Sequence, residues 1–354
     1  MKDDTPQHTQ PTSRARSGSA GGPSLITDVA RLAGVSTATV SRVINNPELV
    51  ADATAERVRR AMDELNYRPN IFAKGLITHS SHVLGIILPD FIGEFYTKLI
   101  SSADKMAQEN GYHVVVSSDA RLGSGDALQS LPLNFLDGIV AMLTFPDPKL
   151  TRSLSSLNVP IVLIDSNDGI SGVDCVRIDN TSGAVQATEH LLLSVEPEDC
   201  FYIGGPASNF DARSRADAFS SSLLGRTDHL RPDQIRYGEY SAAWGVEWAM
   251  ENLPSRVGKT TGIFAGDDEI ALGIMNVASA KSIHVPNDLR IVGFDGTRMC
   301  EIVRPTLSSV AVPFDLIGRS AIDLCIQRIA DPDRPSEIIP AQTLLQVRES
   351  STPA

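Results

Sequence analysis

The sequence predicts an N-terminal all-α helix-turn-helix domain followed by an α/β core of two doubly wound parallel-sheet subdomains. Helical periodicity with short loops runs from Leu25 to Tyr67, and apolar runs then alternate with helix-like segments. Such runs indicate strands that are buried on both faces of a sheet. They comprise residues 83–89, 113–116, 138–143, 160–164, 200–203, 262–265 and 290–294. Because one small doubly wound domain does not need so many strands, we expect two subdomains.

The domain boundaries follow from changes in composition along the chain. Residues 1–23 are rich in Ser, Gly, Pro and Thr and poor in large apolar side chains, so we expect a disordered tail. Residues 24–68 form the helix-turn-helix domain, and residues 69–82 form a hinge helix and linker. The core is expected to span residues 83–348, and residues 349–354 to form a second tail.

Composition excludes several classes of protein. The net charge of -12 gives no general argument for nucleic-acid binding, although residues 24–75 carry a local net charge of +1. No apolar run is long enough for a membrane helix or a secretory signal, so we expect a cytoplasmic protein. The four cysteines lack ligand spacing, which predicts buried thiols and no metal site. No cofactor is expected.

The helix-turn-helix prediction rests on two short amphipathic segments joined by Gly34-Val35-Ser36. Ser36 is placed to cap the second helix. One face of each helix is apolar, with Ile26, Val29, Ala30 and Ala33 on the first helix and Val40, Val43 and Ile44 on the second. The opposite face of the second helix carries Thr37, Ala38, Ser41, Arg42 and Asn45. These short side chains with one Arg suit base edges and phosphates, although an ordinary helical hairpin with a solvated face gives the same local pattern.

Several blocks of residues resemble the LacI/GalR family of transcription regulators. In the first domain they are Asp28-Val29-Ala30, Ala33-Gly34-Val35-Ser36, Thr39-Val40-Ser41-Arg42-Val43-Ile44-Asn45 and Asn66-Tyr67-Arg68-Pro69-Asn70. In the core they are Gly85 to Asp90, Asp137-Gly138-Ile139, Gly204-Gly205-Pro206, Val285 to Asp288 and Val292-Gly293-Phe294-Asp295. The resemblance implies a core that is similar to periplasmic sugar-binding proteins.

The resemblance implies a set of DNA-binding residues. Thr37, Ala38 and Arg42 would set the base preference, and Arg42 would pair with guanine. Leu76 would enter the minor groove from a hinge helix that forms on the operator. The full predicted set is Thr27, Ser36, Thr37, Ala38, Thr39, Ser41, Arg42, Asn45, Thr54, Tyr67, Asn70, Ala73, Lys74 and Leu76.

Some positions depart from the family pattern. Leu25 and Ala51 stand where side-chain helix caps are usual, so we expect weaker caps there, although Ser24 offers a cap one residue early. Gly75 lies inside the short hinge helix, where Gly costs about 1 kcal/mol relative to Ala. The segment Ile92-Gly93-Glu94 replaces a commoner Ser-Asn-Pro, and Asp267 stands where many members have Asn.

The predicted effector site is a polyol-binding set at the carboxyl ends of the core strands. Carboxylates accept hydrogen bonds from vicinal hydroxyls, and an aromatic ring stacks on a sugar. The predicted residues are Phe95, Tyr96, Asp165, Arg213, Tyr240, Asp267 and Asp295, with Arg213 assigned from the family resemblance. Helix capping is an alternative role for Asp165 and Asp268, and Asp179-Asn180 is better explained as a helix start.

The predicted partners are a pseudo-palindromic operator, a small sugar-like effector and a second copy of the chain. Specific operator binding takes two half-sites and therefore a two-fold protein. No heptad repeat follows Arg348, so we expect dimers. The favoured function is a repressor that an inducer releases. Alternatives are a repressor that needs a purine-like or sugar-phosphate corepressor and a sugar-binding protein that does not bind DNA; an enzyme is disfavoured because no nucleotide-binding or catalytic motif is present.

Overall fold

The structure is a computed structural model that describes residues 24–68, 80–89, 93–118, 135–143, 159–165, 172–253 and 259–352. The chain divides into two units, residues 1–79 and 80–354, and each is described by itself. The expected tail at residues 1–23 lies outside the described residues. So do Ile92 and the predicted hinge positions Asn70, Ala73, Lys74 and Leu76.

The first unit is the predicted three-helix domain. It contains α1 (Ile26–Ala33), α2 (Thr37–Asn45), the short 3-10 helix η1 (Pro47–Leu49) and α3 (Asp52–Glu64). Its core forms where the apolar faces of the three α-helices meet, and Val29, Val40 and Val58 are fully buried in it. Helical periodicity therefore predicted these helices correctly.

The ends of these helices show how the chain turns between them. Gly34 ends α1 in a left-handed conformation with φ of 66°, which Gly adopts without steric cost. The Ser36 hydroxyl caps α2 by accepting a 3.1 Å hydrogen bond from the Thr39 N–H. As expected, Ala51 provides no side-chain cap for α3. Ser24 does not cap α1, because its hydroxyl donates to the Leu65 carbonyl oxygen instead, at 2.7 Å.

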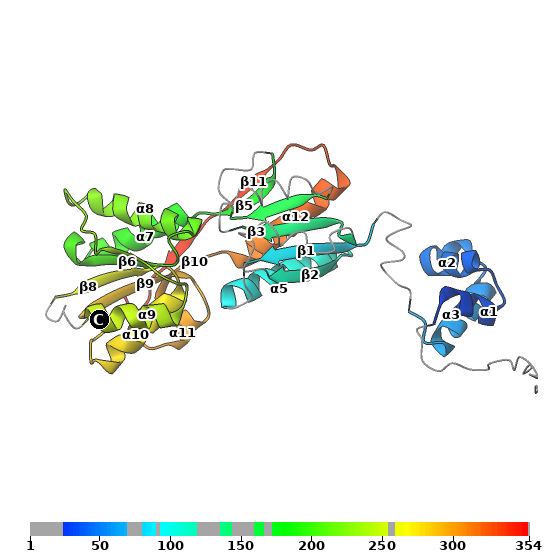
Figure 1. The fold of residues 1–354 in the computed structure, drawn as a ribbon, viewed down its shortest axis with the longest axis horizontal. Helices are drawn as coiled ribbons and strands as arrows, with labels where there is room; N and C mark the ends of the chain where they lie inside the picture. Colours follow the sequence, from blue (N-terminus) through cyan, green and yellow to red (C-terminus); the bar gives the residue numbers. More distant parts are fainter. Residues whose placement is uncertain are drawn as a thin grey trace, which may run out of the picture. The chain divides into compact units, whose positions relative to one another are not determined.

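The second unit contains two six-stranded sheets, and the first sheet is parallel throughout. Its strand order is β11-β5-β4-β3-β1-β2. The strands are β1 (Val83–Leu88), β2 (His113–Ser118), β3 (Gly138–Met142), β4 (Ile161–Ile164), β5 (Asp174–Ile178) and β11 (Ile338–Ala341). Two long helices, α5 (Glu94–Glu109) and α12 (Phe314–Ala330), pack against each other in this subdomain (Figure 1).

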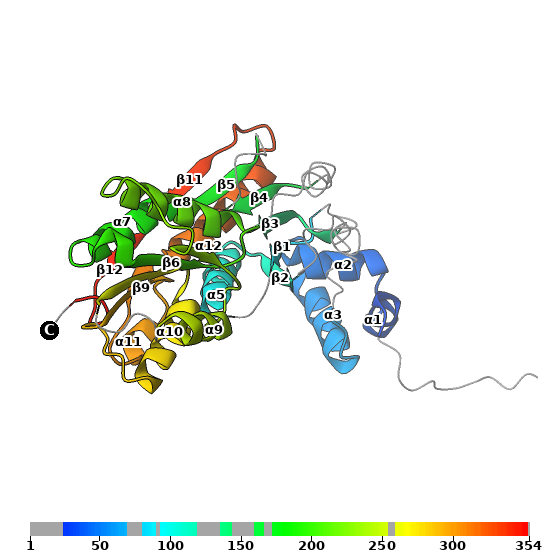
Figure 2. The same ribbon diagram turned by 60° about the vertical axis from the view of Figure 1, so that its left-hand side comes forward.

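The second sheet has the strand order β12-β10-β9-β8-β6-β7, and only β12 runs antiparallel to its neighbour. The strands are β6 (Cys200–Gly204), β7 (Ile235–Tyr237), β8 (Thr261–Ala265), β9 (Leu289–Asp295), β10 (Ser308–Ala311) and β12 (Leu344–Gln346). The helices are α7 (Asn180–Leu192), η4 (Pro197–Asp199), α8 (Phe210–Leu224), α9 (Ala242–Asn252), α10 (Asp268–Ala280) and α11 (Met299–Ile302). Figures 1 and 2 show α7 beside α8 on one face of the sheet and α9 beside α10 on the other. This is the predicted doubly wound arrangement.

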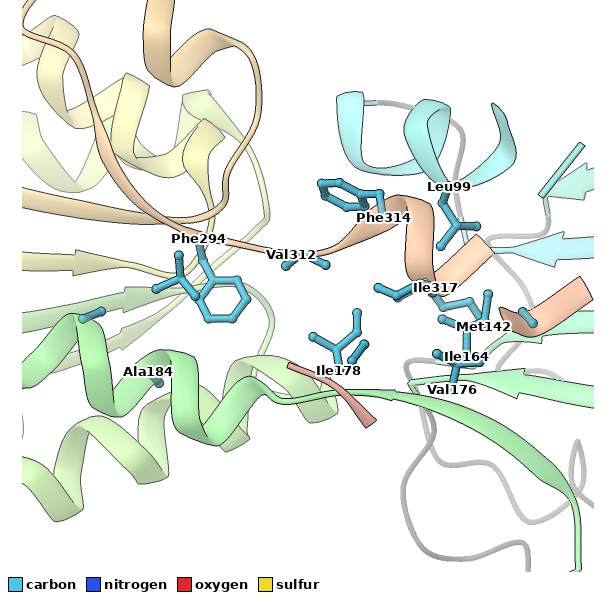
Figure 3. Close-up of a cluster of buried hydrophobic side chains, with 14 of the residues drawn as sticks. Leu99, Met142, Ile164, Val176, Ile178, Ala184, Phe294, Val312, Phe314 and Ile317 are labelled. Carbon is cyan, nitrogen blue, oxygen red and sulfur yellow. The ribbon is translucent and has the colours of Figure 1, made fainter. Parts of the chain in front are cut away.

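The chain passes between the two subdomains after β5, after β10 and after β11. Buried apolar side chains line these passages and form one continuous cluster. Figure 3 shows Val312 and Ile178 between Phe294 of one subdomain and Ile317 of the other. The subdomains are therefore joined by several short segments that share a core, which restricts the ways in which one moves against the other.

Both the first and the last residues of the core differ from the expected boundaries. Ser81 donates hydrogen bonds to the Asp137 carboxylate through its N–H at 2.7 Å and its hydroxyl at 2.8 Å, so the core begins before residue 83. The Ser350 N–H donates to the Thr306 carbonyl oxygen, and the Ser350 carbonyl oxygen accepts from the Ile291 N–H. Residues 349–351 are therefore fixed to β9 and the segment before β10, whereas the sequence suggested a tail. All four cysteines are buried, as expected.

Candidate functional site

The exposed face of α2 carries the side chains that the sequence predicts to read DNA. Thr37, Ala38, Arg42 and Asn45 are exposed, and Ser41 is half-buried. Within the described residues the Arg42 guanidinium makes no ion pair or hydrogen bond, whereas Arg60 on α3 pairs with Glu56. A guanidinium that is exposed and unpaired within the described residues is available to the acceptors of a guanine edge.

The other predicted DNA-binding residues of this domain lie around α2. Thr27 is exposed on α1, and Thr54 is half-buried on α3. Tyr67 packs half-buried against the helical core. The Ser36 hydroxyl contacts the backbone N–H and the hydroxyl of Thr39, at 3.1 and 3.0 Å, so its structural role is to begin the helix. Roles in DNA contact for these residues stay predictions.

In the core, a group of buried and half-buried polar side chains surrounds Arg215, and we call it the polar cluster. Three of its four aspartates lie at the ends of strands or helices: Asp165 follows β4, Asp295 ends β9, and Asp267 precedes α10. Each of these carboxyls interacts electrostatically with the Arg215 guanidinium. The cluster therefore combines groups from both sheets. Its members are Asp165, Asn180, Asp211, Arg215, Tyr240, Asp267 and Asp295.

The α8 helix places Asp211 and Arg215 on one face, because they stand four residues apart. Arg215 is 4% exposed. Its Nε donates to Asn180 Oδ1 at 2.8 Å, its Nη1 donates to the Gly266 carbonyl oxygen, and the guanidinium lies 3.6 Å from the centre of the Phe294 ring. Burial alone would lower the pKa of Arg215, but Tyr240, Asp295 and Asp211 outweigh it and raise the pKa. Arg215 is thus held as a cation in the interior.

Asn180 joins two carboxyls of the cluster. Its Nδ2 donates to Asp165 Oδ2 at 3.1 Å and to Asp211 Oδ1 at 3.3 Å. Asp165 Oδ1 also accepts from the Ile178 N–H at 3.2 Å. Burial, followed by the neighbouring Asp211, raises the pKa of Asp165 well above its usual value. Burial likewise raises the pKa of Asp211, although Arg215 opposes the shift.

Two of the aspartates have strained backbone. Asp165 has φ of 50° and Asp295 has φ of 108°, both in the left-handed region that non-Gly residues rarely adopt. Each lies where a buried parallel strand ends. Strain of this kind persists where the surroundings enforce it, and it concentrates at functional positions. The conformations mark these two residues as the best candidates for ligand contact.

Two polar groups of the cluster lack hydrogen-bond partners among the described residues. The hydroxyl of Tyr240 is buried and unpaired, and the tyrosine ring packs where a Cβ on Gly205 would lie 2.4 Å from it. The Asp295 carboxyl makes no hydrogen bond within the described chain, although it interacts with Arg215. Because an unpaired buried polar group costs free energy, the Tyr240 hydroxyl is poised to bind an added donor or acceptor.

Asp267, Asp268 and Asp179 also accept hydrogen bonds from nearby groups of the protein. Asp267 Oδ1 caps α10 by accepting from the Ile270 N–H at 2.7 Å, and burial raises the pKa of Asp267 to about 7. Asp268 accepts from Ser309 and from the Thr297 N–H, at 2.6 and 2.7 Å. Asp179 caps α7 by accepting from the Ser182 N–H at 2.9 Å, so the helix start expected at Asp179-Asn180 is confirmed.

Three further predicted effector residues lie in apolar or surface settings. Phe95 stacks edge-on against Phe314 and Tyr96, with ring centroids 5.2 and 5.1 Å apart. Arg213 is half-buried and donates to the Ala207 carbonyl oxygen at 2.7 Å. The sequence reasoning did not assign Asn180, Asp211 or Arg215 to the site. A signal was available, because Arg215 shares its helix face with buried Ala212 and Phe219 and so points inward.

A cavity of about 430 Å³ lies beside the polar cluster and shares only Asn180 with it. Residues of β5, β11 and α8 form its other walls. Its volume is within the range of small-molecule pockets, but the cluster has the charged and unpaired groups, so we place the candidate site at the cluster. In the described part of the chain, no group of His, Cys, Asp and Glu side chains is arranged to hold a metal ion. No described helix is long and apolar enough to cross a membrane.

Comparisons with known proteins agree with both units. Residues 25–70 match the family model of bacterial regulatory proteins of the lacI family, and residues 197–351 match a periplasmic binding protein-like domain. The chain is 31% identical over 328 residues to catabolite control protein A of Priestia megaterium. This match covers 92% of this chain and 98% of that protein.

Two solved structures have the same architecture. The lac repressor dimer bound to operator and the anti-inducer ONPF matches with a TM-score of 0.82 and 26% identity, covering 93% of this chain and 99% of that one. The complex of the transcriptional regulator CelR with cellobiose matches with a TM-score of 0.69 and 28% identity, covering 93% and 100%. The similarity thus extends through the helical unit and the core.

Proposed function

Because the chain belongs to the LacI family of bacterial regulatory proteins and is a sequence-specific DNA-binding transcription regulator, we propose that the polar cluster binds a sugar-like effector that changes its affinity for the operator. The protein acts in this proposal as a repressor, as a dimer, and in the cytoplasm at the nucleoid. The observation that carries the proposal is the polar cluster around Arg215. Both core subdomains contribute residues to this cluster.

The DNA-binding part of the proposal rests on α2. Arg42 pairs with a guanine, Thr37 and Ala38 set the neighbouring base preference, and Thr39, Ser41 and Asn45 contact phosphates or fix the position of the helix. One helix of this length reads only a few base pairs, so two copies bind the two halves of a pseudo-palindromic operator. Thr27, Ser36, Thr54 and Tyr67 support the helix from the rest of the domain, and Leu76 of the hinge enters the minor groove.

The effector part rests on hydrogen-bonding chemistry. Vicinal hydroxyls of a polyol donate to the Asp165 and Asp295 carboxyls and accept from Arg215 and Tyr240. A related regulator, CelR, is in complex with the disaccharide cellobiose. The cavity beside Asn180 offers additional room where the cluster meets β5.

The coupling between effector and operator in this proposal depends on a site to which both core subdomains contribute residues. Asp165 follows a strand of the first sheet, whereas Asp211 and Arg215 lie on a helix that packs against the second. An effector that contacts both subdomains favours one of their relative arrangements, and the hinge passes this preference to the DNA-binding domain. The effector must bind the two states with different affinities, because equal affinity would change nothing.

A thermal-shift screen of the full chain against sugars, polyols, sugar phosphates and nucleobases tests the proposal. The operator is first selected from random duplex DNA, and each stabilising compound is then tested for its effect on operator binding. We expect a sugar-like compound to raise the melting temperature and weaken operator binding. A compound that stabilises the protein without any effect on DNA affinity would contradict the proposed coupling.

A further inference from the structure

The Asp137 carboxylate stands directly before β3 and binds the first residues of the core. Its Oδ1 accepts from the N–H and from the hydroxyl of Ser81, at 2.7 and 2.8 Å. Its Oδ2 accepts from the Ser80 hydroxyl at 2.7 Å and from the His82 N–H at 2.9 Å. One side chain thus accepts four hydrogen bonds from three consecutive residues that are 55 to 57 positions away in the sequence. We call these four contacts the Asp137 clamp.

The hydrogen bonds of the clamp go to a charged acceptor. Burial alone would raise the pKa of Asp137, but the hydrogen bonds of the clamp outweigh it and lower the pKa. Hydrogen bonds to an ionised carboxylate are stronger than those between neutral groups. Ser81 is 6% exposed, and its hydroxyl also accepts from the Val83 N–H at 3.0 Å. Its side chain is therefore fixed by a donor contact and an acceptor contact.

The backbone of His82 is restrained in the same region. It has φ of 55°, in the left-handed region that non-Gly residues rarely adopt. Its N–H is bound by Asp137, its carbonyl oxygen accepts from the His113 N–H at 2.8 Å, and its ring centroid lies 5.4 Å from that of Tyr112. Such a conformation persists where surrounding contacts enforce it. Tertiary contacts therefore set the direction in which the chain enters β1.

The clamp holds the part of the core that is joined to the DNA-binding unit. The core unit begins at Ser80, and residues 1–79 form the other unit, so the chain joins the two units at this point. The Asp137 N–H also donates to the Val83 carbonyl oxygen at 2.9 Å, where β3 pairs with β1. Residues 80–82 are thus fixed to the centre of the first sheet.

We propose that Asp137 is a positioning residue for operator binding, which fixes where and in which direction the chain leaves the core for the DNA-binding unit. This inference rests on the dimer in the proposed function and does not require the effector site. Two recognition helices must meet two half-sites at one spacing. Without the clamp, residues 80–82 have to be ordered again on the operator, and the entropy of that ordering opposes binding.

The inference distinguishes three kinds of DNA. A half-operator engages one recognition helix, so its binding needs no fixed spacing between two copies. Random-sequence DNA is bound through its phosphate charge, which also needs no fixed spacing. Only the affinity for the full operator should therefore depend on the clamp.

Fluorescence anisotropy of the full chain with these three duplexes tests the inference. The operator is first selected with the parent protein from random duplex DNA. Asp137→Ala removes all four contacts of the clamp. We expect its affinity for the full operator to fall about fivefold or more, and its affinities for the half-operator and for random-sequence DNA to change less than about twofold.

Asp174→Asn is the matched control for destabilisation of the core. Asp174 begins β5 of the same sheet and accepts from Arg328 at 2.9 Å and from the Glu337 N–H at 2.8 Å. It therefore fixes the chain around α12 and β11, and not the chain before β1. We expect the control to lower the melting temperature at least as much as Asp137→Ala does, but to change the affinity for the full operator less than about twofold.

The outcomes separate this inference from the proposed function. Unchanged affinity of Asp137→Ala for the full operator would overturn the inference alone, and so would an equal loss in Asp174→Asn. A parent protein that binds the half-operator as tightly as the full operator would contradict the dimer and, with it, the inference. Should Asp137→Ala fail to fold, the double variant Ser80→Ala, Ser81→Ala removes the hydroxyl contacts of the clamp, and the same outcomes apply to it.

Discussion

The Glu94 carboxylate accepts hydrogen bonds from the backbone N–H of Arg298, with Oε1 and Oε2 at 3.0 and 2.8 Å. Glu94 begins α5 in the first core subdomain, and Arg298 precedes α11 in the second. Burial raises the pKa of Glu94, but hydrogen bonds from Lys98 and Arg298 outweigh this effect and lower it. A side chain of one subdomain is therefore linked to the backbone of the other.

Replacing Glu94 should loosen this link. Glu94→Ala removes both contacts to Arg298. We expect this to destabilise the observed arrangement of the subdomains by only about 1 kcal/mol, because Glu94 is partly exposed. We expect effector affinity measured by calorimetry to fall by up to about tenfold, because part of the binding energy is then spent on restoring the arrangement. Lys98→Ala is the control, since it leaves the Arg298 contact in place. Equal effects of the two variants would show that the Arg298 contact has no such role.

A pair of substitutions identifies the arginine at the centre of the proposed effector site. Arg215→Lys keeps the charge but loses the planar donor fork, and it leaves Asn180 and the Gly266 carbonyl oxygen with fewer partners. We expect it to lower the free energy of unfolding by about 2 kcal/mol or more and to abolish the effector response. Arg213→Lys should change stability by less than about 0.5 kcal/mol. Loss of the response in Arg213→Lys alone would return that role to Arg213.

Asp267 should make the stability of the core depend on pH. Its folded pKa of about 7 lies above the unfolded value, so the unfolded state loses its proton first as pH rises. Asp267 therefore costs no stability below about pH 4, costs progressively more up to about pH 7, and costs a constant amount above that. Asp267→Asn, which still caps α10, should gain up to about 4 kcal/mol over the parent protein above pH 7 and nothing at pH 4.

Thermal unfolding of the two proteins from pH 4 to pH 8 measures this difference. Asp267→Ser, a second uncharged cap, should reduce the pH dependence of stability in the same way. A constant difference between variant and parent across the whole range would contradict the assignment.

Arg42 should contribute base-specific affinity. Arg42→Ala removes a guanidinium that makes no ion pair within the described residues, so it should weaken binding to the selected operator by about 1 to 3 kcal/mol and relax preference at one base pair. Arg60→Ala, which removes an exposed guanidinium paired with Glu56, is the control. Fluorescence anisotropy with operator and single-base variants gives both values. An equal loss of affinity for all DNA sequences would show that Arg42 contacts a phosphate and not a base.

The sequence predicted the strands that are long and apolar but missed several others. Runs such as residues 200–203 and 290–294 became β6 and β9, because strands covered on both faces need continuous apolar side chains. In contrast, β5 begins with Asp174, which pairs with Arg328, and β10 begins with two serines that are fully buried. The polar residues of these strands find partners far away in the sequence, and local periodicity carries no information about such partners.

The sequence likewise predicted some residues of the candidate site and missed others. Asp165, Asp267 and Asp295 follow or end strands, so topology predicted that they would lie near one another, and all three interact with Arg215. The choice between Arg213 and Arg215 depends on the rotation of α8 about its axis, which only the apolar face of Ala212 and Phe219 indicates in the sequence. Asn180 seemed only to begin a helix, yet its amide joins Asp165 to Asp211, a contact between residues that local sequence patterns do not relate.

Operator affinity as a function of effector concentration tests the central claim most directly. The compound that stabilises the full chain would be titrated into a protein–operator complex, for the parent protein and for Asp295→Asn, which removes an unpaired carboxyl at the end of β9. We predict that the compound changes the operator dissociation constant of the parent about fivefold or more and leaves that of Asp295→Asn unchanged. The same change in both proteins would contradict the claim that the polar cluster controls DNA binding.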